Sequence, residues 1–128
     1  MRRRKFILGI GSLAIAPSLN LPLIAFAQEC RLAPRLLAYS FTSDTVEWSM
    51  SIGAGQSCVR GTRYNDTMIN HVQLITPPQS GQVTLAQNSF YYQAAADFQG
   101  MDSFTFSISG TRLGVSGNST IRVLVSVK

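Results

Sequence analysis

Hydrophobic and polar residues alternate with a period of two along much of the chain. Within 46–52, 104–109 and 121–127 an apolar residue stands at every second position, and the residues between them are mostly serine, threonine or charged. Successive side chains of a β-strand point to opposite faces of a sheet. Each stretch therefore predicts a strand with one buried and one solvent-exposed face, and Trp48 is predicted to anchor the core.

The remaining β-rich runs are separated by turn-forming residues rather than by helices. These runs are 57–64, 68–76, 82–86 and 89–93. Glycine, proline, asparagine and serine mark the predicted turns at 53–55, 65–66, 77–81, 99–100 and 114–118. A helical turn fits only 32–37, where Pro34 limits it. Seven short strands without helices between them predict an all-β, antiparallel sandwich, and the length suits an immunoglobulin-like one.

Residues 1–27 have the organisation of an export signal peptide. Arg2–Lys5 form a basic start, residues 6–27 are uncharged, and Ala25-Phe26-Ala27 supply a cleavage site before Gln28. A retained membrane anchor is the alternative, because the uncharged stretch approaches the roughly 20 apolar residues that a bilayer requires. Arg3-Arg4-Lys5-Phe6-Ile7 resembles a twin-arginine signal, so both this route and the general secretory route stay open. Either route predicts a periplasmic or secreted protein with no membrane span after signal removal.

The charge balance argues against a nucleic-acid partner. The chain has 128 residues and a formal net charge of +5, but four basic residues lie in the leader. From Gln28 onward, seven basic residues stand against six acidic ones, which leaves +1. The excess positive charge therefore describes the leader and not a binding surface. The length also excludes an enzyme with separate cofactor and substrate domains.

Two cysteines, Cys30 and Cys58, follow the leader. A lone cysteine pair in an exported protein predicts a structural disulfide. The chain then divides into the signal peptide at 1–27, an N-terminal segment at 28–43 tied down by the disulfide, and the sandwich at 44–128. A zinc site is disfavoured because His71 has no second histidine or neighbouring cysteine, and a redox pair is disfavoured because the C-x-x-C spacing is absent.

From Pro78 to Val127 the chain resembles the cadherin-like, immunoglobulin-like modules of bacterial surface and secreted proteins. The matching residues are Pro78 with Gly81-Gln82-Val83, then Tyr92, then the stretch Phe98-Gln99-Gly100-Met101-Asp102-Ser103-Phe104-Thr105-Phe106, then the alternating valines of 120–127. The resemblance implies the same sandwich fold. Some of these modules bind calcium, but Asp97 and Asp102 are the only close acidic pair here, and Ca²⁺ needs six to eight oxygen ligands, so no metal is expected.

The same motif has a direct physical interpretation. Gly100 can supply a positive φ before a strand. Asp102 can accept backbone N–H groups from the turn at 99–100. Phe98, Phe104 and Phe106 can fill the core. The motif therefore predicts folding and not catalysis.

Candidate chemistry is sparse. No G-x-S-x-G sequence is present, His71 is the only possible imidazole base, and Asp44 and Glu47 fall on opposite faces of one strand. Arg60, Arg63 and Tyr64 form the one local basic and aromatic cluster after the leader. They are candidates for contact with an anion or a polysaccharide, and the alternative is that the two arginines are simply solvated.

The leading hypothesis is therefore a non-enzymatic, exported Ig-like module with a binding or structural role at the cell envelope, whose partner is a protein or a glycan. The alternative is a soluble component of an envelope assembly or secretion system, defined by its partner. A minimal hydrolase is the third and most remote hypothesis. No cofactor is expected.

Overall fold

The computed structural model describes residues 30–32 and 38–128, which form eight strands. The predicted signal peptide, its cleavage site at Ala27 and Gln28, and most of the predicted helical turn lie outside the described residues. In chain order the strands are β1 (Arg31–Leu32), β2 (Asp44–Ile52), β3 (Ser57–Gly61), β4 (Thr67–Thr76), β5 (Gln82–Ala86), β6 (Ser89–Gln93), β7 (Gly100–Arg112) and β8 (Val115–Val127).

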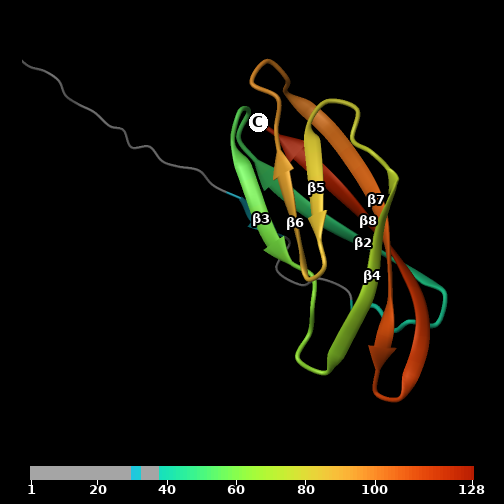
Figure 1. Cartoon of the computed structure of the whole chain (residues 1–128). Coiled ribbons are helices and arrows are strands. Elements are labelled where there is room, and N and C mark those ends of the chain that lie inside the picture. Colours follow the sequence, from blue (N-terminus) through green and yellow to red (C-terminus); the bar gives the residue numbers. More distant parts are fainter. Residues whose placement is uncertain (1–29, 33–37) are drawn as a thin grey trace, which may run out of the picture.

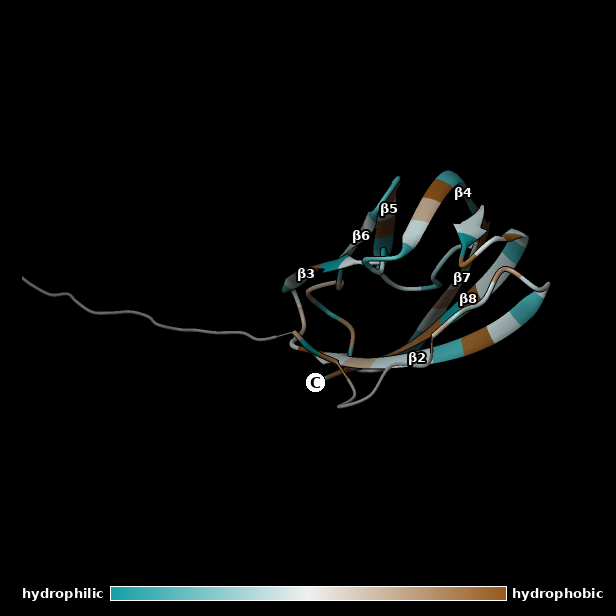
Figure 2. Cartoon of the chain, turned by 90° about the horizontal axis from the view of Figure 1, so that it is seen from below, coloured by the Kyte–Doolittle hydropathy of each residue, from teal (hydrophilic) through white to brown (hydrophobic). Residues whose placement is uncertain are grey.

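The strands form two sheets that pack as a sandwich (Figure 1). One sheet has the order β1-β2-β8-β7-β4, and the other has the order β3-β6-β5. Figure 2 shows the two layers from below, with β3, β5 and β6 on one side and β2, β7 and β8 on the other. Aromatic rings join the layers, since Phe90 of β6 lies 5.2 Å from Phe104 of β7 between ring centroids. The predicted all-β sandwich is confirmed.

Two details differ from the expected antiparallel, seven-stranded arrangement. β2 pairs with β8 in parallel register, with Trp48 opposite Val123. A short additional strand, β1, pairs antiparallel with β2. An alternating pattern fixes which face of a strand is buried but does not fix the direction of its neighbour. The parallel pair therefore could not be predicted from periodicity.

The core is built by the alternating positions that the sequence marks. In β2 the burial pattern alternates residue by residue, and Trp48 is 2% exposed. In β7 the buried apolar positions alternate with serine and threonine, and in β8 they alternate with Arg122, Leu124 and Ser126. The largest fully buried side chains are Trp48, Tyr39, Tyr92, Phe41, Phe90, Phe104 and Phe106. Tyr39 and Phe41 precede residue 44, so the core begins within the N-terminal segment.

The β7–β8 hairpin is longer than expected and has a tighter turn. β8 begins at Val115, so most of the predicted turn at 114–118 is strand. Arg112 pairs with Val115, which leaves a two-residue turn of Leu113 and Gly114 with φ values of 52° and 80°. Positive φ at both central residues is the geometry that fits the right-handed twist of paired strands.

Two glycines in this hairpin allow the backbone of neighbouring segments to approach closely. Gly110 of β7 lies opposite Gly117 of β8. A Cβ atom on Gly117 would collide with the carbonyl oxygen of Phe41, and a Cβ atom on Gly110 would collide with the carbonyl oxygen of Met68. The backbone around Phe41 therefore crosses directly over the hairpin backbone, which places Phe41 in the core.

Candidate functional site

The candidate binding residues Arg63 and Tyr64 lie in the loop between β3 and β4, at one end of the sandwich. Thr67, the first residue of β4, closes this loop. The Thr67 hydroxyl donates to the carbonyl oxygen of Tyr64 at 2.7 Å, and the Thr67 amide donates to the same oxygen at 3.1 Å. The Tyr64 amide donates to the Thr67 hydroxyl at 3.0 Å. The loop is thus closed by hydrogen bonds between Thr67 and Tyr64.

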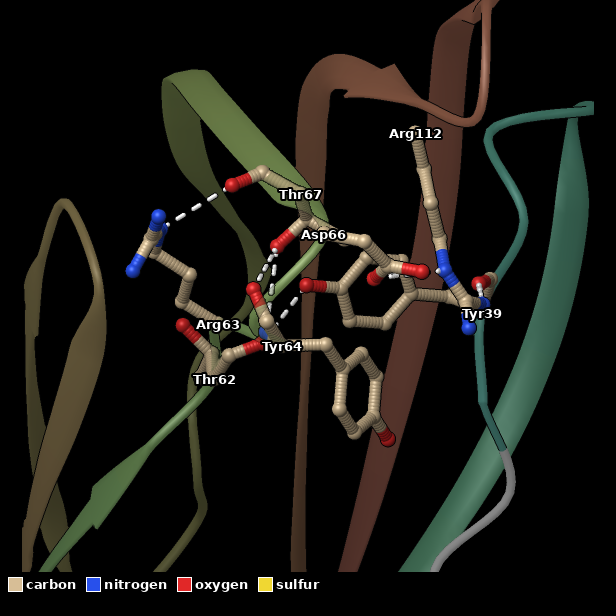
Figure 3. Close-up of polar contacts among 7 residues, drawn as sticks. All are labelled: Tyr39, Thr62, Arg63, Tyr64, Asp66, Thr67 and Arg112. Carbon is tan, nitrogen blue, oxygen red and sulfur yellow. Dashed lines mark hydrogen bonds and ion pairs between the residues drawn. The ribbon is translucent and has the colours of Figure 1, made fainter.

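Arg112 holds this loop against the rest of the molecule (Figure 3). Its Nε atom lies 3.1 Å from Asp66 Oδ1, and its Nη1 atom donates to the carbonyl oxygen of Tyr39 at 3.0 Å. Its guanidinium carbon stands 5.4 Å from the ring centroid of Tyr64. One side chain from β7 therefore joins the β3–β4 loop to the N-terminal segment. We call Tyr39, Tyr64, Asp66 and Arg112 the arginine clamp.

The two tyrosines of the clamp pack on each other, with ring centroids 5.1 Å apart. The Tyr39 hydroxyl donates to the carbonyl oxygen of Thr62 at 2.7 Å. Burial raises the pKa of Tyr39, and burial together with the neighbouring Tyr39 raises the pKa of Tyr64. Both phenols therefore stay neutral at ordinary pH.

The structure separates the three residues that the sequence groups as a binding cluster. Tyr64 is half-buried in the clamp. Arg63 donates from Nε to the carbonyl oxygen of Thr67 at 3.0 Å, and its side chain extends to the side of the loop away from Arg112 (Figure 3). Arg60 lies on β3, in register with Phe90, so it shares neither the loop nor the contacts of the other two. A binding role for these residues stays a prediction.

Asp102, from the recognised motif, is the most highly bonded side chain in the described structure and is 6% exposed. It accepts the backbone amides of Gln79, Ser80 and Gly81 at 2.9, 3.3 and 3.0 Å, and the Ser103 amide at 2.9 Å. These amides come from the loop between β4 and β5 and from Ser103, and not from the turn at 99–100 as expected, because the side chain points inward from β7.

The hydroxyl of Tyr92 completes this network by donating to Asp102 Oδ2 at 2.8 Å. Burial opposes the charged carboxylate, but the hydrogen bonds from Gly81, Tyr92 and Gln79 outweigh it and lower the pKa of Asp102. Burial, the same hydrogen bond and the nearby negative charge raise the pKa of Tyr92 far above its usual range. Asp102 is therefore a structural anion bound by its own chain.

The other motif residues also take structural positions. Gly100 has φ 134° at the start of β7, as its predicted role requires. Phe104 and Phe106 are fully buried, and Phe98 packs against the core while remaining partly exposed.

Asp44 plays a comparable part that the sequence does not indicate. Its carboxylate accepts the Ser40 amide at 2.9 Å, the Thr42 amide at 3.2 Å and the Ser119 hydroxyl at 2.6 Å. Burial opposes ionisation here as well, but the hydrogen bond from Ser119 and those from the backbone lower the pKa of Asp44. An acidic residue preceded closely by serine and threonine is the only sequence signal for such a loop.

Cys30 and Cys58 form a disulfide between the chain just before β1 and the interior of β3. Their Cα atoms are 5.6 Å apart and 28 positions separate them in sequence. The Cα distance lies within the range typical of disulfides. The bond joins the edge of one sheet to the edge of the other, and it is the pairing that the sequence predicts.

Removing this disulfide is expected to cost about 3 kcal/mol of unfolding free energy, because the closed loop restricts the unfolded chain. Urea unfolding of the native protein and of a Cys30→Ser, Cys58→Ser variant measures the difference. Intact mass after thiol alkylation supplies the control, and two alkylated cysteines in native protein would contradict the assignment.

No three histidine, cysteine, aspartate or glutamate side chains within 30–32 and 38–128 come together as a metal site. The same residues include no helix of sufficient length and apolar character to cross a membrane. The charged networks found here bind the protein's own backbone.

The tip of the β7–β8 hairpin carries an unusual residue. Leu113 has a left-handed backbone, with φ 52°, and is 76% exposed, more than any other large apolar side chain of the described residues. Its neighbour in the hairpin, Val115, is 40% exposed. Asparagine, aspartate and glycine are the usual residues at such a position, because Cβ-branched or bulky side chains are strained there. The turn thus exposes a large apolar side chain, although the left-handed backbone of Leu113 is unfavourable in free energy.

The family model described as "Bacterial Ig domain" matches residues 40–124. No curated protein matches the chain. Domains of this kind are typical of surface and secreted proteins, and the disulfide agrees with an extracytoplasmic location. The matched segment spans the sandwich from the N-terminal crossing to β8, so the chain belongs to the bacterial Ig domain family.

Proposed function

We propose that this protein is a non-catalytic, exported Ig-like module that binds an envelope protein through the tip of its β7–β8 hairpin. The observation that carries the proposal is Leu113, a large apolar residue held exposed in a left-handed turn. A left-handed conformation costs a non-glycine residue about 1–2 kcal/mol. Strained residues concentrate at functional sites, where the strain is retained because the side chain is needed.

The fixed position of the residue before the tip supports this role. Arg112 immediately precedes Leu113, and the arginine clamp fixes it to Asp66, Tyr39 and Tyr64. Because Arg112 is held in place, the hairpin tip loses less conformational entropy when it binds.

The clamp also defines the chemistry of the partner. Because Asp66 pairs with Arg112, the tip presents Leu113 and Val115 without a net charge beside them. Apolar anchors of this kind bind in desolvated apolar pockets. A protein pocket therefore fits the tip better than an anionic lipid surface, which attracts clustered lysine and arginine.

Export is the other part of the proposal. The basic start, the uncharged stretch and the small residues before Gln28 support a signal peptide that is cleaved after Ala27. N-terminal sequencing of the protein recovered from the producing cell tests this directly. A mature N-terminus at Gln28 is expected, and a retained Met1 would favour the anchor instead.

Leu113→Asn tests the binding tip, because asparagine accepts the left-handed conformation and removes the apolar side chain. The variant is expected to be as stable as the native protein or up to about 1 kcal/mol more stable, and to bind its partner at least about tenfold more weakly. Parallel affinity capture from the envelope with both proteins identifies the partner by difference.

Thermal unfolding of the same two proteins is the control for folding. Met101→Asn, which changes an exposed apolar residue near the start of β7, is the matched control for loss of apolar surface. Equal capture of the same proteins by Leu113→Asn and by the native protein would contradict a binding role for the tip.

A further inference from the structure

The outer face of the three-stranded sheet is built from uncharged residues. Side chains alternate along its strands, with Cys58, Phe90 and Tyr92 buried and their neighbours facing outward. Cross-strand register arranges the outward residues in three rows: Ser57, Gln93 and Gln82; Val59, Tyr91 and Thr84; and Gly61, Ser89 and Ala86. None of these nine residues carries a charge.

Tyr91 stands at the centre of this face, on the middle strand. It is 40% exposed, and its row neighbour Val59 is 63% exposed. The Tyr91 hydroxyl donates to Gln93 Oε1 at 3.0 Å. Gln93 is fixed in turn, because its Nε2 atom donates to the carbonyl oxygens of Gly55 at 3.0 Å and Ala94 at 3.3 Å. The hydrogen bond to Gln93 therefore holds the Tyr91 ring along β6, and the exposed ring is available for a ligand to stack on.

The groups around the ring are hydrogen-bonding but neutral. The side chains of Gln82, Thr84 and Ser57 present amides and hydroxyls, which both donate and accept. The outer face of the other sheet lacks this combination. There, exposed Glu47 and Arg122 pair at 3.4 Å and hydroxyl residues surround them.

We propose that the outer face of the β3-β6-β5 sheet is a binding site for a neutral polysaccharide. The faces of a sugar ring are weakly apolar and stack on an aromatic ring, while its hydroxyls match amides and hydroxyls. The absence of charge complements a ligand without carboxylates or phosphates, since an anionic glycan would be desolvated with no cation to meet it. An apolar ligand is disfavoured, because Val59 and Tyr91 stand among polar side chains. This site is independent of the Leu113 tip.

Affinity electrophoresis of the oxidised mature protein in native gels tests this site. The probes are three neutral polysaccharides, a β-glucan, an α-glucan and a galactomannan, with polygalacturonate as the charged comparison. At least one neutral polysaccharide is expected to slow migration in a concentration-dependent way, and polygalacturonate is not. Tyr91→Ala is expected to weaken the effect at least about tenfold, as truncation of an aromatic anchor does.

Two matched variants distinguish stacking on the Tyr91 ring from binding at the hairpin tip and from hydrogen bonding by the Tyr91 hydroxyl. Leu113→Asn should bind the polysaccharide like the native protein, because the tip lies on a different part of the molecule. Tyr91→Phe keeps the ring and removes the hydrogen bond to Gln93, and it should retain most of the binding. Near-ultraviolet circular dichroism and thermal unfolding check that Tyr91→Ala is folded.

The proposal is overturned if none of the three neutral polysaccharides retards the native protein, or if folded Tyr91→Ala is retarded equally. Retardation by polygalacturonate alone, lost in Arg63→Gln, would place glycan binding at the β3–β4 loop instead.

Discussion

Asp102→Asn is expected to lower the free energy of unfolding by about 4 kcal/mol, one of the largest effects of a single substitution in this protein. The carboxylate accepts four backbone amides and the Tyr92 hydroxyl while only 6% exposed. An asparagine of the same shape has one fewer acceptor oxygen and turns an NH₂ group toward those donors. Hydrogen bonds to charged groups contribute about 1.5–3 kcal/mol each and are not additive in a shared network. Urea unfolding measures the loss.

Asp97→Asn is the matched control, because Asp97 is exposed and lies in the loop just before β7. Its substitution should change stability by less than about 0.5 kcal/mol. Tyr92→Phe removes one donor from the network and should cost about 1 kcal/mol. Because Tyr92 and Asp102 bond directly, the double variant should cost less than the sum of the two. A loss below about 1 kcal/mol for Asp102→Asn would show that the loop at 79–81 does not depend on the carboxylate.

The same network makes stability depend on pH. The pKa of Asp102 is lower in the folded protein than in the unfolded chain, so the unfolded state takes up protons first as pH falls. The contribution is complete above the unfolded pKa, near about 3.9, and is lost as pH falls through the folded value. Asp44 shifts in the same direction and adds to this loss. Native protein should therefore lose stability on acidification below about pH 5, and Asp102→Asn should show a smaller acid-dependent loss.

Three charged side chains of the described residues are committed to the protein's own fold. Asp102 binds the loop at 79–81, Asp44 binds the segment around residues 40–42, and Arg112 binds Tyr39 and Asp66. Groups saturated in this way are poorly suited to contact a ligand, because each new contact would break an existing one. The surfaces proposed for binding are accordingly an apolar turn and an uncharged sheet face, and the two can be removed independently by Leu113→Asn and Tyr91→Ala.

The sequence predicts the strands well because their positions depend on a local rule. Local sequence pattern is enough to place β2, β5 and β6. It also places residues 104–109 of β7 and 121–127 of β8. It does not place β1, which has two residues and depends on pairing with Met50 and Ser51 of β2. It also does not show that β7 and β8 extend as far as Arg112 and Val115, because the glycines within the hairpin resemble turn residues.

The site is harder to predict because it depends on contacts between distant segments. Arg63 and Tyr64 are adjacent in sequence, but Tyr64 packs with Tyr39 and Arg112, which lie more than 20 positions away. The motif correctly marks Asp102 as an acceptor, but its partners come from a loop more than 20 positions earlier. Leu113 has no sequence signal as a binding residue, since its significance lies in its backbone conformation.

Gly117→Ala is expected to lower the free energy of unfolding by about 4 kcal/mol, although it adds a single methyl group. The new Cβ atom would collide with the Phe41 carbonyl oxygen. Overpacking usually costs about 1–3 kcal/mol, because side chains can rotate away. Here the obstructing atom belongs to a backbone that is itself fixed, since the Phe41 amide donates to the Ser119 hydroxyl at 2.8 Å and Ser43 donates to Asn118 at 2.8 Å. Urea unfolding measures the effect.

Gly61→Ala provides the matched control, because a Cβ atom there meets only Asn88 at 3.8 Å, an ordinary contact, and Gly61 also lies within a strand. This variant should be as stable as the native protein within about 0.5 kcal/mol. Gly110→Ala should resemble Gly117→Ala, because its Cβ atom would meet the backbone of Met68 and the ring of Phe41. If Gly117→Ala and Gly61→Ala had equal stability, the Phe41 segment would not cross the hairpin at backbone contact. Gly117 would then be dispensable, whereas the crossing of the Phe41 backbone requires this position to lack a side chain.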